Sequence, residues 1–257
     1  MLFVRRNALK TNEITSNALM MLWQEPFQYL KCYAEITNNI HAGWFLSWFS
    51  ALCMPYEEME LSNDDICHDL CFSKAQWSKV RSLLVKVGIL NHRTEKKQSF
   101  YSLNEDKVEL LLRQRKFTQE SPSMELVLPD VVNVNRLHLM ALTEQGVSLN
   151  AVILLSWLIN SIPTKPIHER ELISEPILIH YDNIALDTFL TKRQISNALK
   201  ELDKIGITQT IKNHDDKEKY STINFEILGN ITLIYTQNKG NNNLTADNIT
   251  TIGVYDE

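Results

Sequence analysis

The sequence predicts a mainly helical α+β fold with small β-elements, arranged as two similar units in tandem. The first observation is a repeat, because residues 73–90 (SKAQWSKVRSLLVKVGIL) recur 118 residues later as residues 191–208 (TKRQISNALKELDKIGIT). The second is that a short helix-forming segment and a turn precede each copy, which indicates a helix-turn-helix. The third is that two short alternating runs follow each copy, which indicates a β-hairpin.

Both copies of the repeat have the local signals of one helix. Ser73 and Thr191 are each followed three residues later by a glutamine, the pattern of a capping box. A glycine follows the last lysine-bearing turn of each copy, where it can adopt the left-handed conformation that ends a helix. Apolar residues recur at helical spacing, so we expect one buried stripe and an opposite face that is polar and largely basic.

The first unit has a helix, a short second helix, the repeated helix and a hairpin, which is the element order of a winged helix. Asn38 or Asn39 is positioned to cap a helix that runs to about Met54, and Ser62 to cap the short helix at 63–71. The other elements expected here are a strand at 2–9, a helix at 16–22, an extended segment at 27–36, hairpin strands at 89–93 and 99–103, and a helix at 107–115.

The second unit repeats this order with different loops. Leu155-Ser156-Trp157 echoes Leu46-Ser47-Trp48 at an offset of 109, so about nine extra residues fall within 163–175. The Tyr101-Ser102 pair of the first hairpin reappears as Tyr220-Ser221. The elements expected here are an extended segment at 134–142, helices at 147–162, 181–189 and 191–205, a strand at 176–180, and a hairpin within 207–227 whose turn lies near 214–217.

These elements divide the chain into an N-terminal segment (1–26), a first winged-helix domain (27–116), a linker (117–133), a second winged-helix domain (134–236) and a tail (237–257). The tail is rich in Asn and Thr, so we expect it to be disordered. No apolar run approaches the roughly 20 residues of a membrane helix. The N-terminus lacks the apolar region of a signal peptide, which predicts a cytoplasmic protein without a membrane partner.

Charge is distributed unevenly along a chain whose formal net charge is −5. Residues 73–97 contain seven Lys or Arg and one Glu, a local charge of +6, whereas residues 56–71 contain six acidic and no basic residues. The second segment, 191–219, contains seven basic and five acidic residues, only +2. If both units contact a polyanion, the first should contribute more electrostatically.

A helix-turn-helix places its second helix in the major groove of DNA, where short polar side chains contact base edges and Lys or Arg contact phosphates. Arg193 suits a guanine edge and Asn197 an adenine edge. The alternative for the candidate residues on the two repeated helices is that they form solvated helix faces. In the first unit the candidate DNA-binding residues are Lys74, Ser78, Lys79 and Ser82 on the repeated helix, and Arg93, Lys96 and Lys97, which we expect to form the basic tip of the hairpin. In the second unit they are Lys192, Arg193, Ser196, Asn197 and Lys200.

Three further features have competing explanations. Gln76 and Gln194 suit adenine, although the capping box gives them a sufficient structural role. Trp77 has the shape to stack on a base, but Ile195 occupies its place in the second copy, which favours the core. Cys67, His68 and Cys71, with Cys53 upstream, resemble a zinc-ligand set. The second copy has Ala185 and Phe189 in place of the last two cysteines, which favours buried thiols and no metal.

No enzyme motif is present in the sequence. It has no Walker loop, no Gly-rich dinucleotide turn, no G-x-S-x-G and no H-E-x-x-H. Only seven glycines occur in the whole chain, and the seven histidines are scattered. We therefore expect a protein that is not an enzyme and has no cofactor.

The first unit, from Ile36 through GWFLSWFSAL to KVGIL and FYSLN, resembles the winged-helix modules of phage and plasmid replication proteins. The second, with ISNALKELDKIGI and KEKYSTINF, resembles the C-terminal winged helix of plasmid replication initiators, which carry two such domains. The resemblance covers about residues 27–230. It implies sequence-specific binding to repeated origin DNA, often with dimerisation and autoregulation.

The sequence therefore predicts a replication initiator or regulator of a plasmid or phage. Its expected partner is double-stranded DNA, with a second copy of the chain and a host replication protein as further candidates. One alternative is a transcriptional regulator of the same architecture. Another is an adaptor that grips a kleisin, or a mobile-element inhibitor of a host system, neither of which binds DNA. The acidic segment 56–71 favours this last class and the +6 segment favours DNA.

Overall fold

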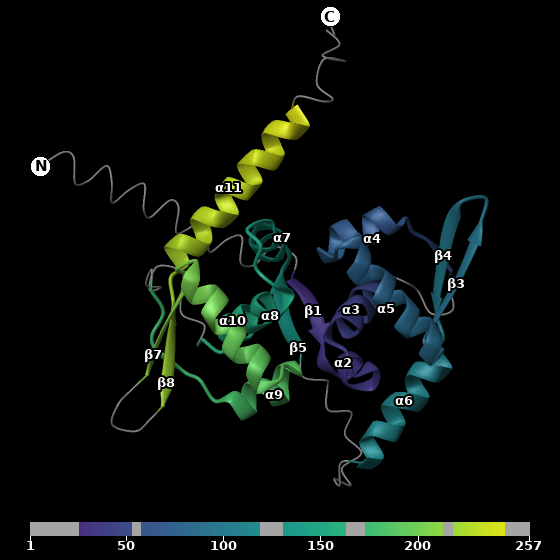
Figure 1. Cartoon of the computed structure of the whole chain (residues 1–257), viewed down its shortest axis with the longest axis horizontal. Coiled ribbons are helices and arrows are strands. Elements are labelled where there is room, and N and C mark those ends of the chain that lie inside the picture. Colours follow the sequence, from purple (N-terminus) through teal and green to yellow (C-terminus); the bar gives the residue numbers. More distant parts are fainter. Residues whose placement is uncertain (1–25, 53–57, 119–130, 163–172, 213–217, 245–257) are drawn as a thin grey trace, which may run out of the picture.

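The computed structural model describes residues 26–52, 58–118, 131–162, 173–212 and 218–244 (Figure 1). The strand predicted at 2–9, the helix predicted at 16–22 and the second hairpin's predicted turn near 214–217 lie outside these ranges. Within them, no helix combines the length and the apolar character that crossing a membrane requires.

The described chain is mainly helical with small antiparallel sheets, which confirms the predicted α+β class. Two runs of elements have the same order: strand, two helices, short strand, two helices, hairpin and helix. The first unit consists of β1 (Pro26–Leu30), α2 (Lys31–Thr37), α3 (Ile40–Leu52), β2 (Met59–Glu60), α4 (Asn63–Leu70), α5 (Lys74–Val87), β3 (Leu90–Glu95), β4 (Gln98–Leu103) and α6 (Glu105–Thr118). The second unit consists of β5 (Val131–Asn135), α7 (Arg136–Glu144), α8 (Leu149–Asn160), β6 (Ile177–Leu178), α9 (Tyr181–Thr188), α10 (Lys192–Lys204), β7 (Thr208–Lys212), β8 (Lys219–Ile223) and α11 (Phe225–Leu244).

The repeated segment forms α5 and α10, and both helices begin in the predicted way. Ser73 Oγ accepts a hydrogen bond from the backbone N–H of Gln76 at 3.2 Å, and Gln76 Oε1 accepts one from the Ser73 N–H at 2.8 Å. Thr191 and Gln194 make the same pair of bonds at the same distances. Both capping boxes are confirmed, which explains the two glutamines structurally.

Strands β1 and β5 join the units into one body. They pair antiparallel, with Phe27 opposite Val134 and Tyr29 opposite Val132. Each strand leads directly into the first helix of its unit, so Phe27 is equivalent to Val132 and Tyr29 to Val134. Exchanging the two units therefore turns the Phe27–Val134 pair into the Tyr29–Val132 pair. The ribbon therefore lies on an approximate twofold axis that passes near the Gln28–Asn133 pair. In Figure 1 the two hairpins accordingly lie at opposite outer ends, the first pointing up and the second down.

Two segments predicted to be extended are extended only at their starts. Residues 31–37 form α2 and residues 136–144 form α7, so the predictions for 27–36 and 134–142 were wrong over these parts. In α2, aromatic and β-branched residues favour a strand locally, but packing overrides them. Gly43 of α3 lies so close to Ala34 that a Cβ on it would come within 2.5 Å of the Ala34 backbone nitrogen. In α7, the Asn135 side chain caps the helix by accepting from the His138 N–H at 3.1 Å.

Three predicted boundaries differ from the observed elements. Helix α6 extends to Thr118 and β5 begins at Val131, so both enter the predicted linker 117–133. Helix α11 includes residues 237–244, which we predicted to be disordered from their composition. Its earlier turns pack on α7 and bury Tyr235. Once these turns have formed, each further residue that joins the helix gains one hydrogen bond. The helix therefore extends through residues 237–244 despite their composition.

The two hairpins align differently from the sequence echo. Leu90 pairs with Leu103 in the first, as Thr208 pairs with Ile223 in the second. The N–H groups of Asn104 and Asn224 donate to Ile89 and Ile207 respectively, at 2.8 Å in both units. Phe100 is therefore the counterpart of Tyr220, and buried Tyr101 that of buried Ser221. The predicted match of Tyr101-Ser102 with Tyr220-Ser221 was wrong by one residue, because the second hairpin loop is longer.

His138 on α7 is a buried histidine that should make stability depend on pH. Burial lowers its pKa from 6.5 to about 4. Between these values the unfolded chain binds a proton that the folded chain does not, so the free energy of unfolding should fall as the pH falls. We expect a loss of about 3 kcal/mol between pH 7 and pH 4, measured by urea unfolding. His138→Gln should abolish that part of the decline, whereas the matched change at exposed His68, His68→Gln, should leave it in place. An unchanged pH profile in His138→Gln would contradict this assignment.

Candidate functional site

The exposed face of α5 and the turn of the first hairpin form the candidate site. Ser78, Lys79 and Ser82 are exposed on α5, as the helical periodicity predicts. Lys96 and Lys97 form the turn between β3 and β4, and both have positive φ, 47° and 73°. These three lysines make no ion pair with other described residues. Their charges are therefore available to a ligand.

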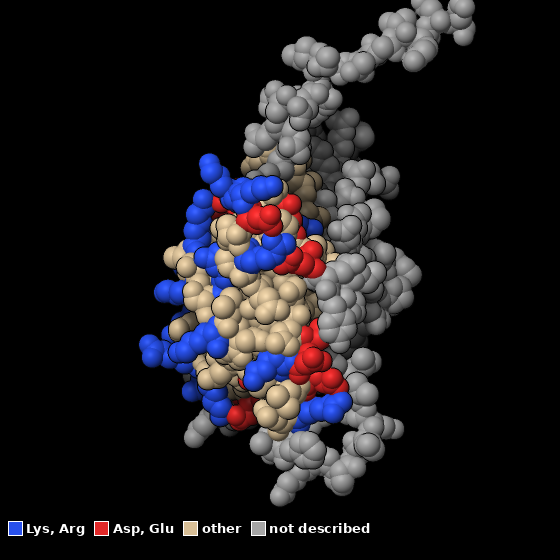
Figure 2. All heavy atoms as spheres, turned by 90° about the vertical axis from the view of Figure 1, so that its right-hand side faces the viewer, with Lys and Arg blue, Asp and Glu red and all other residues tan. Residues whose placement is uncertain are grey.

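Basic side chains gather on one side of the first unit. Figure 2 views the molecule from the right of Figure 1, and most Lys and Arg side chains in that view lie toward its left edge. That edge is the side that faces the reader in Figure 1, along the direction of the approximate twofold axis.

Two predicted lysines are already engaged by acids. Lys74 Nζ lies 2.9 Å from Asp64, and Lys192 Nζ lies 2.7 Å from Asp182. The second pair repeats the first at the offset of 118, so the ion pair is a feature that the two units share. The hydrogen bond that Lys74 donates to the Asp64 carboxylate raises the pKa of Lys74. All four side chains are exposed, so the pairs add little to stability, but a phosphate would compete with a carboxylate for each lysine.

Arg93 is not part of the hairpin turn, which corrects the prediction of a tip made of Arg93, Lys96 and Lys97. Strand β3 continues to Glu95, and Arg93 pairs with Phe100 inside the ladder. Its guanidinium bonds to Glu58 through Nε at 2.8 Å and Nη2 at 2.6 Å, and to Glu95 at 2.7 Å. It also stacks on the Phe100 ring at 4.2 Å. The hydrogen bonds from Arg93 lower the pKa of Glu58. Arg93 is thus neutralised and held within the sheet.

The second unit exposes most of its predicted DNA-binding residues on α10. Arg193, Asn197 and Lys200 are exposed on α10, and Ser196 is half-buried. Two of the acids in this segment serve as structural acceptors. Glu201 accepts from the Ser148 N–H at 3.0 Å, and Asp203 accepts from the hydroxyls of Thr208 and Thr210 at 2.6 and 3.1 Å. The sequence count of +2 does not reveal that these carboxylates are committed elsewhere.

Sequence reasoning missed a hollow between α5 and the first hairpin. It has a volume of about 420 Å³ and is bounded by the starts of α4 and α5 and by the β3–β4 turn. The lining residues used below are Asn63, Lys74, Trp77, Ser78, Arg81 and Lys97. Arg81 was not among the predicted site residues, although it belongs to the +6 segment.

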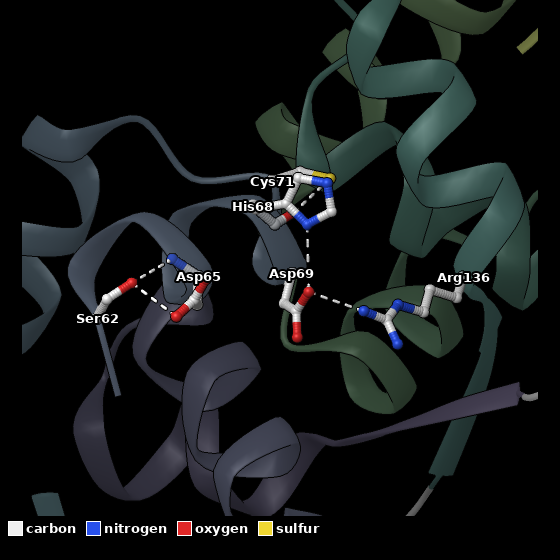
Figure 3. A network of polar contacts seen from close by, with 6 residues as sticks. All are labelled: Ser62, Asp65, His68, Asp69, Cys71 and Arg136. Atoms are coloured by element: carbon white, nitrogen blue, oxygen red, sulfur yellow. Dashed lines mark hydrogen bonds and ion pairs between the residues drawn. The ribbon is translucent and has the colours of Figure 1, made fainter. Parts of the chain in front are cut away.

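Two residues of the zinc hypothesis, His68 and Cys71, lie instead at the junction of the two units (Figure 3). Asp69 lies between His68 and Arg136, accepting from Arg136 Nη2 at 2.8 Å and lying 3.3 Å from His68 Nδ1. Burial raises the pKa values of the Cys67 and Cys71 thiols. No three His, Cys, Asp or Glu side chains in the described part of the chain come together as metal ligands, and Cys53 lies outside it. The junction links α4 of the first unit to α7 of the second.

No protein-family model matches this chain, and no curated protein matches it. Function is therefore inferred from the chain's own residues.

Proposed function

We propose that this protein is a tandem winged-helix protein that binds duplex DNA sequence-specifically, as a replication initiator or regulator of a plasmid or phage. The observation that carries the proposal is the set of exposed lysines on α5 and on the turn of the hairpin that follows it, which form no ion pair with any residue that the structure describes. In each unit, α4–α5 or α9–α10 would be the helix-turn-helix and the hairpin would be the wing. Lysines in these places suit phosphates beside a groove occupied by the second helix.

The twofold relation of the units supports simultaneous contact by both. Equivalent helices that share one orientation along the axis suit two neighbouring major grooves, which lie about 34 Å apart along one face of the duplex. The site would then contain two dissimilar half-sites in inverted orientation. Since α5 and α10 differ at several positions of this face, with Arg193, Asn197 and Lys200 in place of Ala75, Lys79 and Ser82, each half-site would have its own sequence. The polar side chains near the helix N-termini, Ser78 and Ser82 or Arg193 and Asn197, would contact the bases.

The proposed role is non-enzymatic and needs no cofactor, with the cytoplasm as the proposed location. A transcriptional regulator would have the same site, and it would differ from an initiator in what the bound DNA controls. Dimerisation and a host replication protein as a partner belong to the initiator role.

Selection from random duplex DNA tests this proposal. Purified protein should retain duplexes at about 50 mM salt and lose most of them at about 200 mM, because counterion release makes phosphate contacts steeply salt-dependent. Sequencing of the retained DNA should reveal an enriched motif with two half-sites. Retention without enrichment would overturn sequence specificity. An absence of retention at the lower salt concentration would overturn DNA binding altogether.

One observation favours a protein-interaction role as the second candidate. On the outer face of the second sheet, Ile211 pairs with Tyr220 and Tyr220 with Leu178, and Ile211 is 55% exposed. The corresponding row of the first sheet is Arg93, Phe100 and Glu60, where the ring is covered by the guanidinium. An apolar row in place of a charged one suits a protein partner. This candidate would gain if the selection retained no DNA.

A further inference from the structure

One hydrogen-bonding centre, the side-chain amide of Asn63, connects the elements around the hollow beside α5. Asn63 Oδ1 accepts from Trp77 Nε1 at 2.8 Å, from the Tyr101 hydroxyl at 3.2 Å and from Arg81 Nη1 at 3.3 Å. These donors come from α5 and β4, so the amide fixes both elements relative to the start of α4. Trp77 and Tyr101 are buried, whereas Arg81 is half-buried at the hollow. Asn63 thereby limits where the Arg81 guanidinium can lie.

The second unit has none of these four residues. At the counterpart positions of Asn63, Trp77 and Arg81 it has Tyr181, Ile195 and Leu199, and Ser221 replaces Tyr101. These replacements, of which Ile195 and Leu199 are apolar, show that the fold of a unit does not require the centre. Its presence in the first unit alone therefore calls for a role that only the first unit has.

Charge in the hollow favours an anion. Three cations and two acids line it, but Lys74 and Asp64 satisfy each other at 2.9 Å. Arg81 and Lys97 remain, opposed by the carboxylate of Glu60. Neither cation forms an ion pair within the described residues. Ser78 adds a hydroxyl donor to a guanidinium and an ammonium, which are the groups that bind phosphate in proteins.

We propose that this hollow seats one backbone phosphate of duplex DNA, bound jointly by Arg81 and Lys97, with Asn63 as the residue that positions Arg81. The inference rests on the proposed DNA-binding function and specifies one of its contacts. A single phosphate between α5 and the first hairpin would fix the register of α5 in the groove. Phosphate contacts of this kind orient a protein on the duplex without reading sequence.

The test is the salt dependence of binding to a 30-base-pair duplex of arbitrary sequence, for Arg81→Ala, Lys97→Ala and the double variant. Each phosphate contact contributes about 0.9 to the slope of log K against log salt concentration. If both cations bind one phosphate, the double variant should lose about 0.9 in total, whereas two separate phosphates would give a loss of about 1.8. A loss near 1.8, or no loss, would overturn the shared seat.

Controls separate this contact from general effects. Arg113→Ala removes the same side chain from an exposed position on α6 and should leave the slope unchanged. In Lys97→Ala, where Arg81 alone would hold the phosphate, Asn63→Ala should lower the slope further, whereas in the Arg81→Ala Lys97→Ala double variant it should not, which a purely structural role would not produce. If Arg81→Ala unfolds at a lower temperature than the parent protein, Arg81→Gln replaces it, both alone and combined with Lys97→Ala. A parent protein that does not bind would overturn the proposed function, whereas a parent that binds with a slope that the double variant leaves unchanged would overturn only the phosphate seat.

Discussion

Replacing Trp77 by alanine should reduce the free energy of unfolding by about 4 kcal/mol, the range found for truncating large buried aromatic residues. Trp77 is 2% exposed. Its ring lies 4.7 Å from Phe45 and 5.8 Å from Tyr101, between centroids, and its Nε1–H bonds to Asn63. The alanine variant would leave a cavity and remove one donor from the centre at Asn63. Urea unfolding followed by circular dichroism measures the loss.

Two companion variants locate the source of this effect. Trp77→Phe keeps most of the ring and should lose far less, mainly the hydrogen bond to Asn63. Trp157→Ala truncates a half-buried tryptophan whose Nε1 donates to Asp187 at 2.9 Å, so its cost should be clearly smaller than that of Trp77→Ala. If Trp77→Ala unfolded at the parent's urea concentration but lost DNA affinity, Trp77 would be a base-stacking residue and its place in the core would be unimportant.

Local signals in the sequence were sufficient for the elements that a few neighbouring residues determine. The capping boxes, the short helices capped by Ser62 and preceding Thr191, and both hairpins follow from spacing within a few residues. Trp77 was predicted to be buried because its counterpart is Ile195 and two copies of one helix share one apolar stripe. The structure confirms this burial. The repeat therefore supplied a comparison that a single copy would lack.

Features that depend on distant residues could not be predicted in the same way. The helix α2 forms where Ala34 meets Gly43, and the β1–β5 ribbon joins residues more than 100 positions apart. The contact of Arg93 with Glu58, which lies 35 positions away, has no local signal, so Arg93 was assigned to the hairpin tip. Likewise, the hollow needs α4, α5 and the hairpin turn together, so no spacing rule identifies Arg81.

Removing three first-unit lysines together should have the largest effect on DNA binding. Lys79→Ala, Lys96→Ala and Lys97→Ala delete charges that no acid in the described residues neutralises. At about 0.1 M salt each lost phosphate contact costs roughly tenfold in affinity, so the triple variant should bind about two to three orders of magnitude more weakly. Fluorescence anisotropy with a labelled duplex measures the dissociation constants across a salt series.

The matched control removes three cations from the second unit: Arg193→Ala, Lys200→Ala and Lys212→Ala. Net charge changes equally in the two triple variants, so a difference between them reports position and excludes long-range attraction. We expect a loss of about tenfold or less in the control, because the first unit combines lysines at its hairpin turn with the Arg81 hollow. Equal losses would mean that both units contribute alike, as their twofold arrangement permits, and would remove the predicted dominance of the first. A larger loss in the control would place the main contact on α10, where Glu201 and Asp203 are already engaged by Ser148, Thr208 and Thr210.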